Sequence, residues 1–166
     1  MNKKIVAFLT VLIIVTIVAA FFLINKTISG PMVYVDPNAI ERGVGQDFAV
    51  NINASDVKNL VGWQLQLGWN LTILTLINVT EGTFLKSGGD TFFGYELNET
   101  FGYVLAYCSV LRNVTGVNGT GVLASVEFHV KAQGSCDLDL QNTELVDASE
   151  EIITHTTNDG HFSTGS

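Results

Sequence analysis

The side chains that could support acid–base chemistry are three histidines near acidic residues. His129 lies on the polar side of an alternating run, and His155 and His161 flank the last short run of the chain, with Asp159 between them. Catalysis of acyl transfer needs a nucleophile, a base and a group that orients the base. No serine or cysteine is placed by the sequence to complete such a set, so the histidines indicate no catalytic triad.

Acidic pairs could supply the two carboxylates of a glycosidase. Asp137/Asp139 and Glu150/Glu151 are such pairs, but the chain holds 16 Asp and Glu residues, so close pairs are expected as solubilising charge. No run has the spacing of an EF-hand calcium loop. We therefore predict that the protein is not an enzyme and that it holds no metal and no cofactor.

The charge balance argues against a nucleic-acid partner. All 16 acidic residues follow residue 35, together with five of the eight basic residues, which gives this part a net charge of −11. Nucleic-acid binding depends on basic patches that neutralise phosphates. No such patch is visible, so we predict no nucleic-acid partner.

Seven of the 13 asparagines begin an N-x-[ST] sequon. They are Asn25, Asn53, Asn70, Asn78, Asn98, Asn113 and Asn118. This number exceeds the frequency expected by chance, and such sequons are used only where the chain meets a glycosylation machinery. The sequence therefore predicts an exported glycoprotein with these seven asparagines as its glycosylation sites.

The two cysteines, Cys108 and Cys136, lie in the part that we expect to be exported, where oxidation can occur. We predict one disulfide bridge between them, and two buried free thiols are the alternative. A bridge across 27 intervening residues would stabilise the fold by roughly 3–4 kcal/mol on the chain-entropy model.

Residues 5–24 form an apolar run of the length that crosses a bilayer. The run, IVAFLTVLIIVTIVAAFFLI, carries no charge, and Lys3 and Lys4 precede it. At about 1.5 Å per helical residue it would be roughly 30 Å long. We expect residues 1–24 to be a signal anchor with one transmembrane helix, the N-terminus cytoplasmic and the rest outside the cell membrane. Cleavage as a signal peptide, which would secrete the protein, is the alternative.

A short tether, residues 25–31, precedes a domain that we place at residues 32–166. Its apolar residues recur with a period of two, which is typical of half-buried strands. Expected strands cover residues 32–35, 47–54, 61–69, 91–97, 103–111, 122–132, 136–140 and 160–164, and residues 71–79 are ambiguous. Trp63 and Trp69 share the apolar side of residues 61–69, so we place both in the core. About nine strands predict an all-β sandwich or jelly roll.

Several of these runs resemble the cohesin domain family, which belongs to a superfamily of carbohydrate-binding modules. Residues 121–134 (GVLASVEFHVKAQG), 138–140 and 158–162 resemble the seventh to ninth cohesin strands, and residues 61–74 (VGWQLQLGWNLTIL) are similar to an earlier segment. Residues 34–37 and 45–52 fit the first two strands. The resemblance covers about residues 32–164. It implies a nine-stranded jelly roll that captures a dockerin module.

By this resemblance, the partner would contact one sheet built from residues 61–69, 91–97, 103–111 and 136–140. The implied contact residues are Gly62, Gln64, Gln66, Leu105 and Tyr107. Residues 61–69 lack the Asn and Asp that dockerin-binding relatives often show there. Two alternatives stay open: a polysaccharide partner that stacks on tyrosines, and a glycosylated structural subunit of a surface layer or filament.

Overall fold

The computed structural model describes residues 30–111 and 115–165 and places most of them in β-strands. The elements are β1 (Met32–Asp36), β2 (Ala39–Glu41), β3 (Asp47–Gly68), β4 (Leu74–Glu81), the single-turn helix α2 (Thr83–Lys86), β5 (Thr91–Asn98), β6 (Tyr103–Val110), β7 (Val117–Val130), β8 (Ser135–Asp147), β9 (Thr156–Asn158) and β10 (Gly160–Ser163). The predicted count of nine strands is wrong, because β2 and β9, with three residues each, are too short to show a period of two.

The strand β3 is the longest of the described part and belongs to two sheets. Its first half pairs with β7 and β1, and its second half pairs with β6 and β8. We expected two strands here, residues 47–54 and 61–69. Between them, Asp56 and Asn59 have positive φ angles, 55° and 57°. The ladder continues through this stretch with register shifts, because Val57 and Leu60 remain in the core.

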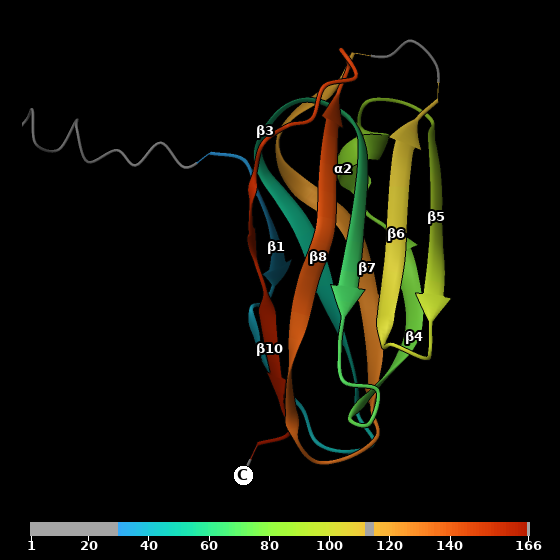
Figure 1. Ribbon diagram of the computed structural model, residues 1–166, viewed down its shortest axis with the longest axis vertical. Helices are drawn as coiled ribbons and strands as arrows, with labels where there is room; N and C mark the ends of the chain where they lie inside the picture. Colours follow the sequence, from blue (N-terminus) through green and yellow to red (C-terminus); the bar gives the residue numbers. More distant parts are fainter. Residues whose placement is uncertain (1–29, 112–114, 166) are drawn as a thin grey trace, which may run out of the picture.

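Two mainly antiparallel layers result from this sharing (Figure 1). The front sheet has the order β5-β6-β3-β8-β10-β2, and the back sheet has the order β4-β7-β3-β1-β9. The parallel pairs β1–β9 and β2–β10 close the side of the sandwich opposite β5. The predicted all-β sandwich is confirmed, with both faces of the core made by strands.

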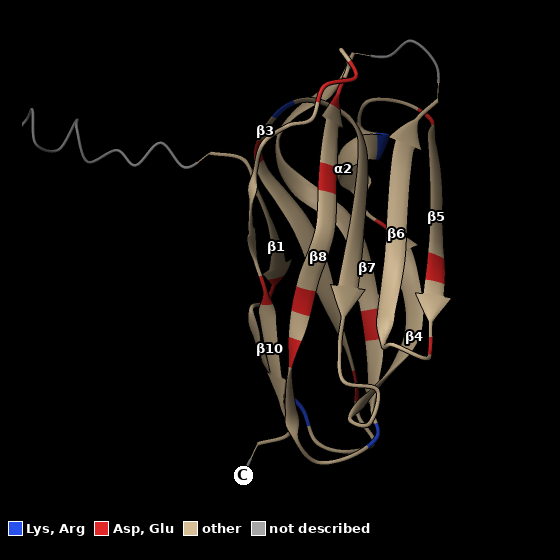
Figure 2. Cartoon of the chain, in the orientation of Figure 1, with Lys and Arg blue, Asp and Glu red and all other residues tan. Residues whose placement is uncertain are grey.

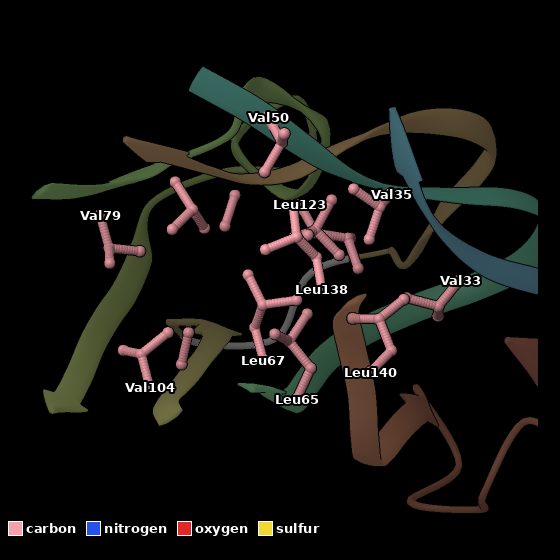
Figure 3. Close-up of a cluster of buried hydrophobic side chains, with 14 of the residues drawn as sticks. Val33, Val35, Val50, Leu65, Leu67, Val79, Val104, Leu123, Leu138 and Leu140 are labelled. Carbon is pink, nitrogen blue, oxygen red and sulfur yellow. The ribbon is translucent and has the colours of Figure 1, made fainter. Parts of the chain in front are cut away.

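The core lies between the two sheets and is almost wholly aliphatic and aromatic. Figure 3 shows Leu65 and Leu67 of the front sheet pointing toward Val50 and Leu123 of the back sheet. Phe128 and Phe162 are fully buried, and Phe48 stacks on Phe162 with ring centroids 5.1 Å apart. Each fully buried aliphatic or aromatic side chain contributes roughly 1.5–3 kcal/mol to folding.

The prediction for the two tryptophans is confirmed. Trp63 and Trp69 are 3% and 8% exposed. Trp63 lies at 6.1 Å from Phe93, and Trp69 packs edge-on against Phe128 at 5.1 Å between ring centroids. Both indoles therefore fill the space between the sheets.

One predicted alternation fails in β7. We expected Leu123 on the polar side of residues 122–132, but it is 1% exposed. The register of β3 against β7 shifts between Ile52 and Asn53, so that Leu123 is the extra residue of a bulge. A bulge places two neighbouring residues on one side of the strand, and here both Leu123 and Ala124 face the core.

The cysteine bridge that we predicted is absent. Cys108 and Cys136 are free thiols. Cys108 stands opposite Trp63, and Trp63 stands opposite Leu145 on β8. Leu145 lies nine residues along β8 from Cys136, which at about 3.3 Å per residue is a distance of roughly 30 Å. A disulfide joins Cα atoms that are less than about 7 Å apart, so the fold keeps the two thiols separate.

Instead, Cys108 takes part in a polar cluster that joins the two sheets. Glu81 of β4 accepts hydrogen bonds from Thr91 of β5 and from the Cys108 thiol, and it forms an ion pair with Lys86 at 3.0 Å. Burial opposes the ionisation of Glu81, but these three donors outweigh it, and the pKa of Glu81 is lowered. Burial and the neighbouring Glu81 raise the pKa of the Cys108 thiol to about 12, which makes it unreactive.

No helix within the described residues is long and apolar enough to cross a membrane. The expected anchor, residues 5–24, and the sequons at Asn25 and Asn113 lie outside the described residues.

Truncating Trp63 should strongly destabilise the domain. Trp63→Ala leaves a cavity between the sheets and is expected to cost about 3–5 kcal/mol of the free energy of unfolding, measured by chemical denaturation. Ile152→Ala, at a site that is 59% exposed, is the control. A loss at Trp63 no larger than that at Ile152 would contradict its place in the core.

The Glu81 cluster should make stability depend on pH. A carboxylate whose pKa is lowered in the folded state stabilises that state above its ordinary pKa of 4.5 and loses this effect as the pH falls through the folded value. The difference in unfolding free energy between wild type and Glu81→Gln should therefore be full at neutral pH and shrink below about 4.5. Glu127→Gln, an exposed change on β7, is the control. A difference that stays constant with pH would argue against the cluster.

Candidate functional site

The four strands that were expected to form a binding surface lie side by side. In the front sheet, β5, β6, the second half of β3 and β8 are consecutive neighbours. Their outward residues form rows across the sheet: Gly62 lies opposite Ser109, Gln64 opposite Tyr107, and Gln66 opposite Leu105. We call the outer surface of these four strands the outer face.

All five predicted contact residues meet on the outer face. On β3, Gln64 and Gln66 alternate with buried residues and Gly62 precedes the buried Trp63, and on β6 Leu105 and Tyr107 alternate with buried residues. The buried residues between them are Trp63, Leu65, Leu67, Val104, Ala106 and Cys108. Because side chains of a strand alternate between its two sides, burial of these six places the predicted residues outward.

The outer face also contains residues that the sequence analysis missed. On β5 they are Phe92, Gly94 and Glu96, which stand opposite Ser109, Tyr107 and Leu105. On β8 they are Asp139, Gln141, Glu144 and Val146, which stand opposite residues of β3. The predicted strand at residues 136–140 ended too early to include Glu144 and Val146. The alternation of residues 91–97 was the signal that could have placed Phe92 and Glu96 outward.

Tyr107 lies flat over the neighbouring strand. A Cβ atom added to Gly94 would lie 2.7 Å from two ring carbons and the hydroxyl oxygen of Tyr107, so this side chain covers the place that another would occupy. Phe92 continues the aromatic surface, with its ring centroid 6.3 Å from that of Tyr107 and an interplanar angle of 29°. The Phe92 side chain is 57% exposed. Phe92 and Tyr107 therefore form an apolar patch on a largely polar sheet.

The outer face has two shallow hollows, which follow one another along β3. The upper hollow, of about 430 Å³, lies over Gly62 and is lined by Gln64, Tyr107, Glu144 and Val146 among others. The lower hollow, of about 570 Å³, lies over Gly68, and its lining includes Gln66, Phe101, Tyr103, Asp139 and Gln141. Each hollow lies over a glycine of β3, where the sheet has no side chain to fill the space.

The outer face is acidic and carries no basic side chain in its four strands. Residues 61–68 and the strands β5, β6 and β8 contain no Lys or Arg, whereas Glu96, Asp139 and Glu144 lie outward (Figure 2). At the lower end, Asp139 is engaged by Gln141, and Gln66 accepts a hydrogen bond of 3.1 Å from Asn142. Glu96 and Glu144 are exposed. A surface of this kind attracts cationic groups.

The histidines make local contacts, and two of them, His155 and His161, contact side chains of β8. Nδ1 of His129 lies 2.6 Å from Asp47, and Nδ1 of His161 lies 2.7 Å from Asp137, both in exposed pairs. His155 lies 2.8 Å from the carbonyl oxygen of Ile153. Within residues 30–111 and 115–165, no three His, Cys, Asp or Glu side chains are placed to hold a metal ion.

The sequons differ in how their asparagines are presented. Asn70 and Asn98 are loop-side residues whose Oδ1 atoms accept hydrogen bonds from the following sequon threonines, Thr72 and Thr100. Asn78 and Asn118 are exposed within β4 and β7 rather than in turns. Asn53 lies inside β3 and is 6% exposed, so the folded domain leaves little room for the glycan predicted there. The other described sequons remain predictions.

A sandwich whose outer face combines flat polar strands, two hollows and an aromatic patch is a protein-binding module. The model of the cohesin domain family matches residues 33–163, and the chain therefore belongs to this family. Cohesin domains are non-catalytic protein-binding modules, so the prediction that the protein is not an enzyme is confirmed. No curated protein matches the chain.

Solved cohesin structures share the fold. A non-cellulosomal cohesin from the hyperthermophilic archaeon Archaeoglobus fulgidus is 20% identical, with a TM-score of 0.68 over 83% of this chain and 93% of that chain. The Coh-OlpC–Doc435 type I cohesin–dockerin complex from Clostridium thermocellum is 10% identical, with a TM-score of 0.68 over 82% and 96% of the two chains. The second type II cohesin module of the ScaA scaffoldin from Acetivibrio cellulolyticus is 18% identical, with a TM-score of 0.67 over 83% and 91%.

The contact between Tyr107 and Gly94 should appear as an energetic coupling. Gly94→Ala places a methyl group inside the volume of the Tyr107 ring and is expected to destabilise by about 1–3 kcal/mol. In a Tyr107→Ala background the same change should cost much less, which a double-mutant cycle on unfolding free energies would measure. Gly62→Ala is the control, because a Cβ there meets its nearest atom at an ordinary 3.5 Å. Additive effects of the two substitutions would contradict the packing of Tyr107 over Gly94.

Proposed function

We propose that this domain captures a dockerin-like module through the outer face of β5, β6, β3 and β8. The observation that carries the proposal is the gathering of Gly62, Gln64, Gln66, Leu105 and Tyr107, which the family resemblance implied, on one continuous surface. Family membership supports it, and so does the fold shared with the cohesin of the Coh-OlpC–Doc435 cohesin–dockerin complex.

The chemistry of the outer face specifies what the partner must present. Tyr107 with Phe92 offers an apolar anchor, and aromatic residues of this kind are the usual hot spots of interfaces. Glu96 and Glu144 flank this region on β5 and β8. A matching partner therefore carries Lys or Arg around an apolar contact that enters the upper hollow. Asn and Asp of dockerin-binding relatives are replaced here by Gly62 and Gln64, so the partner differs from theirs at this point.

The alternative polysaccharide partner has less support from the arrangement of the tyrosines. Sugar binding by stacking needs exposed aromatic rings in a row. Tyr95 belongs to the inner side of β5, with Phe93, whereas Tyr103 and Tyr107 belong to the outer face. The Tyr107 side chain also packs over Gly94, so one side of its ring is covered. These three tyrosines therefore share no common platform.

The location remains part of the proposal. An uncharged run at residues 5–24 and seven sequons support an anchored protein whose domain lies outside the cell membrane, or a secreted one if the run is cleaved. In the anchored case the short tether, residues 25–31, would hold the start of β1 near the end of the apolar run.

Reversing one charge of the outer face should weaken capture of the partner. The domain, residues 30–166, is immobilised and exposed to extracts of the source organism. We expect it to retain a protein that contains a dockerin-like calcium repeat. Glu144→Lys should weaken its binding by at least about tenfold, about 1.4 kcal/mol, measured with the purified partner. A calcium chelator should abolish binding, because it unfolds such repeats.

The matched control is Glu127→Lys, which makes the same change of net charge on β7 in the back sheet. It should leave binding unchanged. If both reversals weaken binding equally, the effect comes from net charge alone and the outer face is excluded. Retention of a partner that binds equally well to Glu144→Lys and wild type would also exclude it.

A further inference from the structure

The outer edge of β5 is an open strand edge that no other described strand covers. Within residues 30–111 and 115–165, β5 pairs only with β6, and the pairing runs from Thr91 to Asn98 without a register shift. Figure 1 shows β5 along one side of the molecule, with β6 as its neighbour in the sheet. An open edge presents backbone N–H and C=O groups that can pair with another strand.

The other three sheet edges are protected. The edge strands β2 and β9 have three residues each, and β4 contains a bulge between Leu76 and Asn78. Shortness and bulges are the devices by which proteins prevent pairing between edges. In contrast, β5 has eight residues (TFFGYELN), no proline, no Lys or Arg, and one charged residue, Glu96. The lack of protection is therefore specific to β5.

Apolar side chains of β5 remain exposed on both of its sides. Phe92 on the outer side is 57% exposed, and Tyr95 and Leu97 on the inner side are 42% and 41% exposed. The inner side of a sandwich strand is normally covered by the opposite sheet. A further strand beside β5 would extend the front sheet and cover these side chains.

The hydrogen-bond pattern defines which backbone groups point to the open edge. Leu111 N–H donates to the carbonyl of Asp90 at 2.7 Å, one step before the first β5–β6 pair. Hydrogen-bonded and non-hydrogen-bonded pairs alternate along an antiparallel ladder. Even-numbered residues of β5 therefore bond to β6, and Thr91, Phe93, Tyr95 and Leu97 direct their N–H and C=O groups outward.

We propose that β5 pairs antiparallel with β5 of a second copy of this chain, with Tyr95 opposite Tyr95 on the two-fold axis. In this register Phe93 stands opposite Leu97 of the other copy, so that all three inner-side apolar residues meet one another. Glu96 stands opposite Gly94, which has no side chain. Two neighbouring symmetric registers are less favourable. A two-fold axis at Glu96 would place this carboxylate against its own copy, and a two-fold axis at Gly94 would place Leu97 against Thr91.

The strand is complementary to itself in each respect that such pairing needs: length, pairing without a bulge, outward-directed backbone groups and an apolar inner side. Such a dimer joins two front sheets into one, with both outer faces on the same side. The pair would thus present two partner surfaces together, and bivalent binding raises avidity without any new contact. The dimer itself does not depend on the proposed partner.

The test uses residues 30–166, which contain all ten strands and match nearly the full length of solved cohesin modules. Protein from a bacterial host leaves Asn98 without a glycan, which would otherwise stand opposite Phe92 of the second copy. Sedimentation equilibrium from micromolar to millimolar concentration should show a monomer–dimer equilibrium. Added salt should strengthen the dimer, because it screens the repulsion between two acidic domains. Tyr95→Lys should raise the dimer dissociation constant at least about tenfold.

Two controls keep the outcome specific. Ile77→Lys, at a 47% exposed site on β4, should leave the dissociation constant unchanged. Under mild oxidation Tyr95→Cys should cross-link to itself, because the Cα atoms of opposed antiparallel residues lie about 5.5 Å apart. Leu97→Cys, at a 41% exposed site that would stand opposite Phe93 of the second copy and not opposite itself, should give only the background of wild type, whose Cys108 and Cys136 are native. A monomer at every concentration, a dimer indifferent to Tyr95→Lys, or equal cross-linking of Tyr95→Cys and Leu97→Cys would each overturn the proposal.

Discussion

Sharing of β3 between both layers is the constraint on which the rest of this structure depends. Phe48, Val50 and Ile52 of its first half face the core from the back sheet, and Leu65 and Leu67 of its second half face the core from the front sheet. One strand thus supplies both layers, and its register shifts near Val57 and Leu60 lie where it passes from the back sheet to the front sheet. The outer face lies on the second half of this strand, where Gln64 and Gln66 alternate with buried residues and Gly62 precedes the buried Trp63. A binding surface on a paired central strand needs no ordering when a partner arrives.

The period of two predicted most of this arrangement, and it failed for identifiable reasons. It placed Trp63, Trp69 and the outward residues of β3 and β6 correctly, because the burial of both strands alternates over residues 63–68 and 103–108. It failed at Leu123, where a bulge reverses the alternation, and at Asn53, whose sequon suggested a turn inside a buried ladder. These positions are decided by the strand that lies alongside, and that information is not contained in the local sequence. The cysteine pairing failed for the same reason, since it depends on which strands are neighbours.

The length of β8 was also not predictable from its local sequence. The segment Gln141–Asn142–Thr143 reads as a turn, and Asn142 does adopt a positive φ of 47°. The strand nevertheless continues to Asp147, with a register shift against β3 between Gln64 and Gln66. Leu145 explains the continuation, because it is 1% exposed and stands opposite Trp63. The buried contact of one leucine thus brings Glu144 and Val146 to the outer face, where no sequence pattern pointed to them.

The glycines of the front sheet separate what folding requires from what binding uses. Gly94 is required by packing, since the Tyr107 ring fills its side-chain position. Gly62 is different: a Cβ there would meet only ordinary contacts, the nearest at 3.5 Å. Glycine inside a strand weakens it by roughly 0.5–1 kcal/mol relative to alanine, so the fold gains nothing from this residue. Its effect is the upper hollow between Gln64, Tyr107 and Glu144. A stability cost without a packing reason, placed at the centre of the outer face, is what a surface shaped to receive a side chain of a partner would show.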